Sequence, residues 1–242
     1  MKYDTQILNE GCRQMGISLT EEQTEQFMLY YEKLIEVNRV MNLTAITEFE
    51  DVMRKHFLDS LTLVKAADIK NVKRVLDLGT GAGFPGIPLK IAFPDTEFVL
   101  LDSLNKRVKF LHDIIELCRL KKIQAVHGRA EELAGKKEYR ESFDLCVSRA
   151  VANLSSLSEY CLPYVEKGGL FVSYKSGNIQ EELEAAGYAI QILGGRIKDT
   201  VKFKLPGSDM DRSLVVIEKI RETPARYPRR AGIPSREPLV RK

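Results

Sequence analysis

The sequence predicts an α/β protein with a doubly wound, mostly parallel seven-stranded sheet, preceded by a helical cap and closed by an antiparallel hairpin. Two observations predict this class. From about residue 71, five apolar, β-rich runs alternate with helix-like stretches, and such alternation is typical of parallel strands joined by crossovers. Two further runs then flank a turn at residues 206–209, which is the pattern of a hairpin.

The first 67 residues are expected to form the helical cap. Thr20 and Gln23 have the spacing of a capping box, in which each side chain satisfies a free amide at the start of a helix. Apolar residues then recur at helical spacing over residues 27–35 and again over residues 53–64. The segment between these two patterns contains turn-forming asparagines and has no clear period.

The sheet is expected within residues 68–220, the second of three predicted parts of the chain. Its strands are expected at residues 72–78, 97–101, 123–127, 143–148, 169–174, 201–205 and 213–220. One intervening helix is expected to start at Asn178, a good N-cap residue, and to end near Gly187. Ligands of such sheets bind beyond the carboxyl ends of the strands, so the site is expected at that edge.

Composition excludes several classes of protein. The chain has 242 residues, 44% hydrophobic and 29% charged, and no apolar run approaches the ~20 residues of a membrane helix. Its N-terminus lacks the apolar core of a signal peptide. Four scattered cysteines without a CxxC pair favour reduced thiols and argue against a metal site. We expect a cytoplasmic protein without a membrane partner or a bound metal, and a monomer.

The third predicted part, residues 221–242, is expected to be an extended basic arm. It carries seven basic and two acidic residues, so its formal charge is +5 while the rest of the chain carries −2. Four prolines disfavour helix and central strand there. A basic arm favours a polyanionic partner, but a solvated tail has the same composition, so charge alone leaves both interpretations open.

A glycine-rich turn follows the first predicted strand. Gly79, Gly81, Gly83 and Gly86 come shortly after Asp77, and glycines at this density let the backbone approach a ligand where a Cβ would collide. The run matches GxGxxG, which alone is weak evidence for NAD and leaves an NAD-dependent oxidoreductase open. The Asp77 carboxylate argues against NAD, because it would repel a pyrophosphate and would suit a cationic, phosphate-free ligand such as S-adenosyl-L-methionine.

Two later segments would complete a nucleoside site. Asp102 ends the second predicted strand, where a carboxylate can accept hydrogen bonds from both ribose hydroxyls of either cofactor, or can simply cap the next helix. The loop after the third strand, residues 128–132, is well placed to bracket an adenine ring. A plain helix start would have the same sequence there.

These motifs, taken in order, resemble a known family. Residues 77–88 are similar to the first motif of the bacterial 16S ribosomal RNA guanine-N7 methyltransferases, also called glucose-inhibited division protein B. Further similar blocks cover nearly the whole chain, at residues 42–46, 56–61, 101–103, 128–131, 148–150, 174–177 and 227–234. The resemblance implies a Rossmann-like class I methyltransferase fold, S-adenosyl-L-methionine as cofactor, and 16S rRNA in the small ribosomal subunit as partner.

The resemblance also implies which residues contact the cofactor. These are Gly79, Gly81, Phe84, Asp102, Ser103, Ala130, Glu131 and Arg149. Asp102 would hold the ribose and Gly81 would allow close approach of the backbone. Phe84 on its own would fit a core position equally well, and Arg149 could instead form a salt bridge with Asp144 or Glu131.

The reaction implied by the resemblance is methylation of N7 of a guanine in the 530 loop of 16S rRNA. Because guanine N7 has an available lone pair at neutral pH, direct in-line transfer needs no general base, and we assign no catalytic acid or base. Arg229 and Arg230 are the first candidates for RNA contacts, followed by Lys175 and Arg196.

Three residues of the predicted cap, Asn42, His56 and Asp59, could lie near the cofactor mouth, although a buried structural role is equally compatible with His56. Besides the methyltransferase and the oxidoreductase, a third hypothesis is a non-catalytic RNA-binding or regulatory protein that keeps a vestigial fold.

Overall fold

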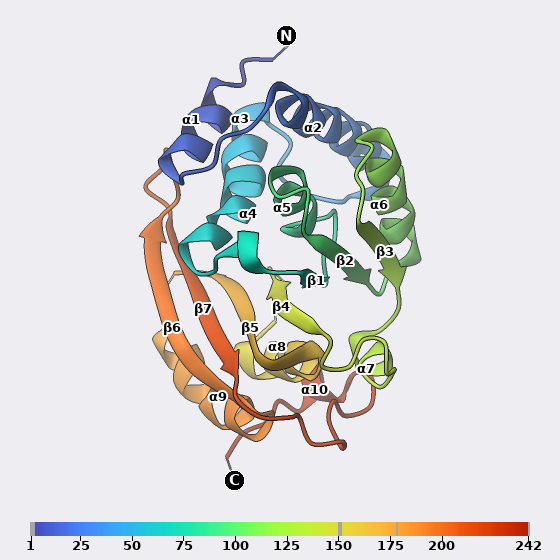
Figure 1. The fold of residues 1–242 in the computed structure, drawn as a ribbon, viewed down its shortest axis with the longest axis vertical. Coiled ribbons are helices and arrows are strands. Elements are labelled where there is room, and N and C mark those ends of the chain that lie inside the picture. Colours follow the sequence, from blue (N-terminus) through green and yellow to red (C-terminus); the bar gives the residue numbers. More distant parts are fainter. Residues whose placement is uncertain (1–2, 150–151, 178, 242) are drawn as a thin grey trace.

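Within residues 3–149, 152–177 and 179–241, which the computed structural model describes, seven strands form one sheet in the order β3-β2-β1-β4-β5-β7-β6 (Figure 1). Their bounds are β1 Arg74–Leu78, β2 Glu97–Asp102, β3 Ile123–His127, β4 Phe143–Ser148, β5 Val165–Ser176, β6 Gly195–Lys204 and β7 Asp211–Lys219. The first five strands pair in parallel, and β7 runs antiparallel to both β5 and β6. The predicted fold class is confirmed.

Helices cover both faces of the sheet (Figure 1). One layer comprises α1 Gln6–Gln14, α2 Glu21–Met41, α3 Phe49–Val52, η1 Met53–Leu58, α4 Asp59–Leu61, η2 Thr62–Lys65, α5 Gly86–Ala92 and α6 Asn105–Leu117. We call its members before β1, from α1 to η2, the N-terminal layer. The other comprises α7 Ala130–Leu133, α8 Leu154–Cys161, α9 Gln180–Ile192 and α10 Ile233–Arg236. Short 3-10 turns lie at η3 Ile69–Asn71 and η4 Leu162–Tyr164. The predicted capping box of α2 is present, with Thr20 and Gln23 each accepting from the other's amide.

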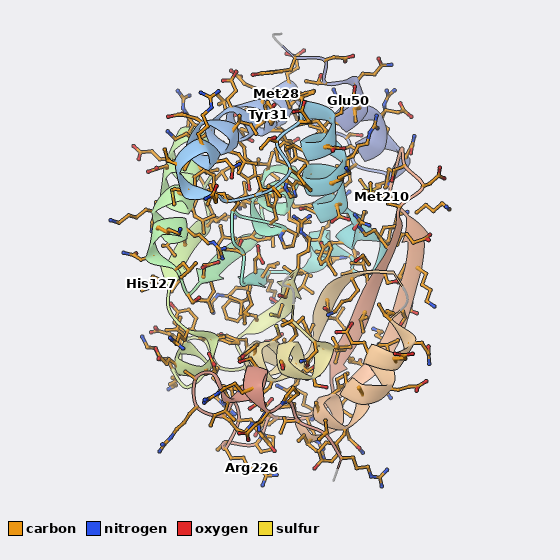
Figure 2. All side chains as sticks on the ribbon, turned by 180° about the vertical axis from the view of Figure 1, so that it is seen from behind. Met28, Tyr31, Glu50, His127, Met210 and Arg226 are labelled. Carbon is orange, nitrogen blue, oxygen red and sulfur yellow. The ribbon has the colours of Figure 1, made fainter. Side chains whose placement is uncertain are left out.

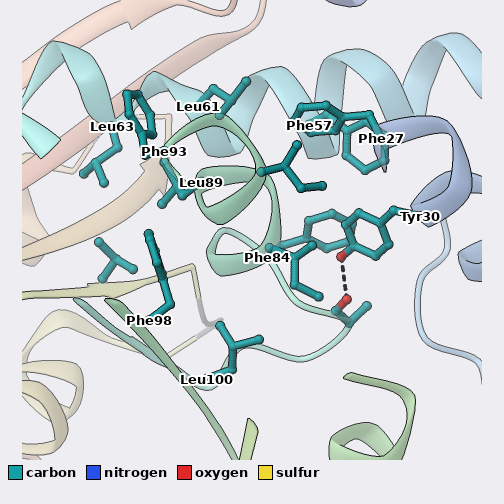
Figure 3. Close-up of a cluster of buried hydrophobic side chains, with 14 of the residues drawn as sticks. Phe27, Tyr30, Phe57, Leu61, Leu63, Phe84, Leu89, Phe93, Phe98 and Leu100 are labelled. Carbon is teal, nitrogen blue, oxygen red and sulfur yellow. Dashed lines mark hydrogen bonds between the residues drawn. The ribbon is translucent and has the colours of Figure 1, made fainter. Parts of the chain in front are cut away.

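The strands bury alternate side chains in two cores. In β1, Val75 belongs to the core shared with the N-terminal helices, and Leu76 belongs to the core beneath α8 and α9. Figure 3 shows Phe27 and Phe57 of the N-terminal helices in the first core, close to Phe84 of the glycine-rich loop. The predicted cap is therefore packed into the same core as the sheet, and the division of the chain into three parts stays a prediction.

The helix α9 differs from its predicted bounds. Asn178 lies outside the described residues, the N-cap position is Ile179, and the helix continues past Gly187 to Ile192. Its buried face carries on through Ala189 and Ile190, which offsets the low helix propensity of a single glycine. The chain leaves the helix at Gly194 instead, where φ is +90°.

The predicted second helix of the cap is not a uniform α-helix. It is π-helical over η1, which carries His56, and α-helical over the next turn, which carries Asp59. Single π-turns within α-helices are frequent at functional sites. Both side chains face the sheet and are buried.

The C-terminal arm is packed against the protein. Arg140 donates to the carbonyl oxygens of Thr223 and Tyr227, and both of these arm residues are buried. The arm also contains the short helix α10, so its expected extended form is only partly correct. Figure 2 places Arg226 at the end of the molecule opposite Tyr31 and Glu50. In the described parts of the chain, no helix is long and apolar enough to cross a membrane.

Candidate cofactor and acceptor site

The glycine-rich loop between β1 and α5 is held at the carboxyl edge of the sheet. The backbone amides of Gly79 and Thr80 both donate to the carbonyl oxygen of Leu101, at the end of β2. Gly79 and Gly81 have φ of +73° and +62°, a region that side chains with a Cβ rarely adopt. A Cβ built on Gly81 would meet no atom within 4 Å. The loop therefore leaves open space where a ligand can approach its backbone.

Asp77 does not face that space, and its predicted role beside a cationic ligand is wrong. Its side chain is fully buried, and its Oδ2 accepts from the Thr80 hydroxyl at 2.6 Å and from the Gly86 amide at 2.7 Å. A Cβ on Gly86 would collide with this carboxyl group. Asp77 thus ties the two ends of the glycine-rich loop together.

Tyr30 fixes the same loop from the other side. Its hydroxyl donates to the carbonyl oxygen of Ala82 at 2.6 Å, the contact drawn as a dashed line in Figure 3. A Cβ on Gly83 would clash with this hydroxyl and with Ile87. A helix of the N-terminal layer therefore sets the conformation of the loop.

A cavity of about 370 Å³ opens beside the loop. Its lining includes five of the predicted cofactor residues, namely Gly79, Asp102, Ser103, Ala130 and Glu131. The buried Asp102 carboxylate accepts from the amides of Gly81 and Leu104 at 2.9 and 2.8 Å. Arg107 also donates to this carboxylate, at 3.5 Å, so of its roughly four acceptor positions about one remains for a ribose hydroxyl. The cavity and the open backbone at Gly81 fit an adenosine-containing cofactor.

Glu131 has a structural contact besides its place in this cavity. Its Oε1 accepts from the amide of Gly232 in the C-terminal arm at 2.8 Å. Ala130, its neighbour, accepts from the Tyr164 hydroxyl through its carbonyl oxygen. The arm is thereby seated against the wall of the cofactor cavity.

A second cavity, of about 530 Å³, adjoins the first, and the two share Ala152. It is bounded by η1 and α4 and by the ends of β4, β5 and β7. Four cationic and two anionic side chains line it: Lys55, Arg149, Lys175, Arg212, Asp59 and Glu182. We call it the acceptor cavity. Its excess of positive charge favours an anionic or electron-rich ligand.

Arg149 lies in this acceptor cavity and is fixed by residues of the N-terminal layer. It donates to Asp59 Oδ2 at 2.9 Å, to the Lys55 carbonyl oxygen at 3.1 Å and to His56 Nδ1 at 3.0 Å. Neither Asp144 nor Glu131, the two salt-bridge partners considered above, is bound to it. Its guanidinium lies 5.1 Å from the centre of the Phe84 ring.

His56 is buried and stacks on Phe84, with ring centres 4.4 Å apart. Its Nε2 is 2.8 Å from the Thr44 hydroxyl, and its Nδ1 accepts from Arg149. Burial, followed by the nearby Arg149 charge, lowers the pKa of His56 to about 3. The imidazole is therefore neutral and its in-plane lone pair is occupied. The structural interpretation of His56 fits this geometry.

Comparison with known proteins identifies the family. A family model described as GidB, rRNA small subunit methyltransferase G, matches residues 23–215. The ribosomal RNA small subunit methyltransferase G of Lachnoclostridium phytofermentans is 56% identical over 239 residues, 99% of each chain. That of Clostridium tetani is 47% identical over 239 residues, 99% of this chain and 100% of the relative. The chain belongs to the rRNA small subunit methyltransferase G family. It is an enzyme with S-adenosyl-L-methionine as cofactor, and the oxidoreductase alternative is wrong.

Solved structures agree with this family on the fold. TrmN from Thermus thermophilus superposes with a TM-score of 0.52 at 16% identity, covering 69% of this chain and 53% of that one. TYW2 from M. jannaschii, solved in complex with AdoMet, gives 0.50 at 14% identity, covering 62% and 70%. At such identities the likeness supports the class I methyltransferase fold.

The four residues predicted to contact rRNA lie in different places. Arg230 is exposed on the arm, and Lys175 lines the acceptor cavity. Arg229 donates three hydrogen bonds to the fully buried Glu159 carboxylate, at 2.7–3.1 Å, which makes it an anchor of the arm. Arg196 pairs with Glu218 on the outer strands, away from the carboxyl edge of the sheet. For this methyltransferase, a phosphate contact through Arg229 would have to compete with a buried ion pair.

Other predicted residues do not line the cofactor cavity, among them Gly81 of the adjoining loop. Phe84 is buried in the core next to Tyr30, and Arg149 lines the acceptor cavity. Asn42 has a left-handed backbone, with φ of +48°, at the end of α2 and lines neither cavity. Their contacts to a ligand stay predictions.

Sequence reasoning missed Glu182 and Arg212. Glu182 lies in the first turn of α9, which follows β5 and starts at the ligand edge of the sheet, so its place after the Lys175 block was an available signal. Arg212 has no such signal, because its partner Asp59 lies 153 residues away. Among the described residues, no group of three or more metal-ligating side chains was found.

Proposed function

We propose that this enzyme transfers a methyl group from S-adenosyl-L-methionine directly to N7 of a guanine in the 530 loop of 16S rRNA in the small ribosomal subunit. One observation carries the proposal: the cofactor cavity and the cationic acceptor cavity meet at Ala152, beside the glycine-rich loop. A methyl donor in the first cavity and a base in the second would lie side by side, as in-line transfer requires.

The chemistry of the acceptor cavity supports transfer without a general base. His56 is neutral, but its lone pair accepts from Arg149. Both oxygens of Asp59 accept from guanidinium groups, Oδ1 from Arg212 and Oδ2 from Arg149. The His56 lone pair is occupied and each Asp59 oxygen is paired with a guanidinium, while guanine N7 needs no general base because it carries no proton at neutral pH. Catalysis then rests on orientation and on fixed charges.

Different residues of this chain would bind the cofactor and the RNA. The bound cofactor supplies a methyl group activated on a sulfonium. Asp102 holds the ribose, and the backbone at Gly79 and Gly81 allows close approach. Ala130 and Glu131 border the adenine. Arg230 contacts rRNA phosphate, and the cationic side chains of the acceptor cavity hold the RNA loop with the target base turned inward.

Labelled methyl transfer tests this function. The protein is incubated with radiolabelled S-adenosyl-L-methionine and small subunits from a strain that lacks this methylation. The label is then mapped by borohydride and aniline cleavage, which breaks the RNA chain at N7-methylguanosine. We expect one labelled guanine, in the 530 loop.

Subunits from a strain that already carries the methyl group are the matched control, and they should take up no label. Label at another base, or at another atom of the same guanine, would overturn the proposal. Naked 16S rRNA, tested in parallel, distinguishes whether the RNA alone or the assembled particle is methylated.

A further inference from the structure

The acceptor cavity is lined by a carboxylate, that of Glu182, one oxygen of which accepts no hydrogen bond from a described residue. Glu182 lies in the first turn of α9 and lines this cavity. Its Oε1 accepts from Lys175 Nζ and from the Leu154 amide, both at 2.7 Å. No hydrogen bond from the described parts of the chain reaches its Oε2, and the side chain is 29% exposed. This oxygen is therefore available to a ligand in the cavity.

The other carboxylate in the cavity, Asp59, is buried and has a guanidinium partner on each oxygen. It serves to position Arg149 and Arg212. Glu182 is thus the carboxylate that can read a base.

Lys175 and Glu182 together present a cation and a carboxylate side by side. Guanine is the base whose Watson–Crick edge has an acceptor, O6, next to two donors, the N1–H and the N2 amino group. Adenine presents the reverse order at the corresponding positions. An ion pair with a vacant carboxylate oxygen therefore complements guanine, and charge-assisted hydrogen bonds of this kind are stronger than neutral ones.

Recognition at this edge also suits the reaction. The N7 atom lies on the opposite side of the purine from N1 and N2. A protein that binds the N1 and N2 donors leaves N7 free to point elsewhere. In this molecule the cofactor cavity adjoins the acceptor cavity at Ala152, which is also the residue whose carbonyl oxygen accepts from Lys175.

We propose that Glu182 is the residue that selects guanine, its Oε2 accepting from the N1–H and the N2 amino group while Lys175 donates to O6. The inference rests on the proposed function, because it assumes that the acceptor base is a guanine. It adds the site that recognises that base and the residues that do so.

Removing one functional group from the acceptor base tests this inference. Small subunits are reconstituted with 16S rRNA that has guanine or inosine at the acceptor position, since inosine lacks only the N2 amino group. We measure kcat/KM on both substrates for the unaltered enzyme, Glu182→Ala and Glu181→Ala. Glu181 is the exposed neighbour in the same helical turn and gives the same charge change.

The unaltered enzyme and Glu181→Ala should prefer guanine by about tenfold or more, the usual effect of a lost hydrogen bond to a charged group. Glu182→Ala should lose most of that preference. Every enzyme is assayed on the same two substrates. An effect of inosine on the RNA fold therefore cancels when the guanine-to-inosine ratios of kcat/KM are compared between enzymes. Calorimetry of S-adenosyl-L-methionine binding, expected to be unchanged, verifies that Glu182→Ala is folded.

Two results would overturn the inference. A fall of equal size on both substrates in Glu182→Ala would assign Glu182 to holding Leu154 and Lys175 in place. An unaltered enzyme that methylates both substrates equally would show that the N2 amino group is not read. If the unaltered enzyme methylates no guanine-containing particle, the proposed function itself fails, and that outcome is distinguishable from the other two.

Discussion

Asp77 is an ionisable residue with no exposure to solvent, at the start of the loop that forms the cofactor cavity. Its Oδ1 has no hydrogen-bond partner among the described residues. Burial raises the pKa of Asp77 to about 7, against the opposing effect of its hydrogen bonds from Thr80 and Gly86. The loop therefore depends on a carboxyl group whose ionisation is unfavourable in the folded state.

Asp77→Asn is expected to change how stability depends on pH. The unfolded chain releases the Asp77 proton near pH 3.8 and the folded chain near pH 7. The favourable contribution of the neutral acid is thus complete below about pH 4 and is lost as the pH rises through about 7. Asparagine cannot ionise. As the pH rises across this window, the unfolding free energy of the variant should therefore increase relative to that of the unaltered protein, by at most ~4 kcal/mol. Urea unfolding at several pH values measures the difference, and a difference that stays constant from pH 4 to pH 8 would contradict the assignment.

His56 provides a second test of burial and charge. The pKa of His56, lowered to about 3, means that its ring stays neutral throughout the physiological range. Its contribution to stability is present above about pH 6.5 and is lost as the pH falls toward 3. The ring signals of His56 in NMR spectra should not shift between pH 8 and pH 5. The chain has only three histidines, so the exposed His112 and His127 serve as comparators.

Replacing Arg149 by glutamine removes the positive charge beside His56, which should raise the pKa of the imidazole. The His56 signals should then begin to shift at a higher pH than in the unaltered protein. An unchanged His56 titration in Arg149→Gln would mean that the ion pair with Asp59 already cancels the effect of this charge.

At the scale of the elements, the sequence located the strands well because each is a run of apolar residues bounded by turns. β3 and β4 match their predicted bounds, whereas β6 begins at Gly195, six residues before the prediction. The early part of β6 lies on an outer strand and is mostly exposed and charged, so it has no apolar pattern to reveal it. The π-helical turn at η1 likewise has no sequence signal that distinguishes it from an α-helix.

The site was less predictable than the fold for a similar reason. The orientation of Asp77 was predictable, because side chains alternate along a strand and Asp77 therefore lies on the same face of β1 as the buried Val75. The ion-pair partners of Arg149 and Arg229 could not be predicted from the sequence. They are Asp59 and Glu159, which lie 90 and 70 residues away in the chain. Ion pairs of this kind depend on tertiary packing, which no local pattern encodes.

The C-terminal arm allows its structural and RNA-binding roles to be separated with neighbouring residues. Arg229→Ala would leave the buried Glu159 carboxylate without its cation, at a cost of about 3–5 kcal/mol. The double variant with Glu159→Gln should recover part of that loss. Arg230→Ala, at an exposed position, should change the unfolding free energy by less than about 0.5 kcal/mol.

Arg230→Ala should instead weaken rRNA binding and reduce the slope of log K against log salt by about one. Filter binding at several salt concentrations measures the slope, and thermal unfolding of both variants gives the stabilities. If Arg230→Ala leaves the salt slope unchanged while Arg229→Ala lowers it without loss of stability, the two roles are assigned the wrong way round.

At the scale of the whole molecule, the N-terminal helices and the sheet are held together by shared burial. Tyr30 and Phe57 come from the N-terminal layer, and both stack close to Phe84 of the glycine-rich loop. Tyr30 also bonds the loop backbone, and Asp59 holds Arg149 at the end of β4. The cofactor loop and the acceptor cavity therefore both require the helical layer to be in place.

This dependence predicts a single cooperative unfolding transition, and the composition offers a clean way to test it. The chain has no tryptophan, so a tryptophan replacing the half-buried Tyr31 reports on the helical layer alone, and one replacing the half-buried Tyr139 reports on the region near β4. In urea the two reporters should have the same midpoint. Phe57→Ala, which opens a cavity in the shared core at a cost of about 3–5 kcal/mol, should lower both midpoints by the same amount. A shift confined to the Tyr31→Trp reporter would instead make residues 1–67 an independently folding domain, and the cofactor loop would then have to keep its conformation without Tyr30.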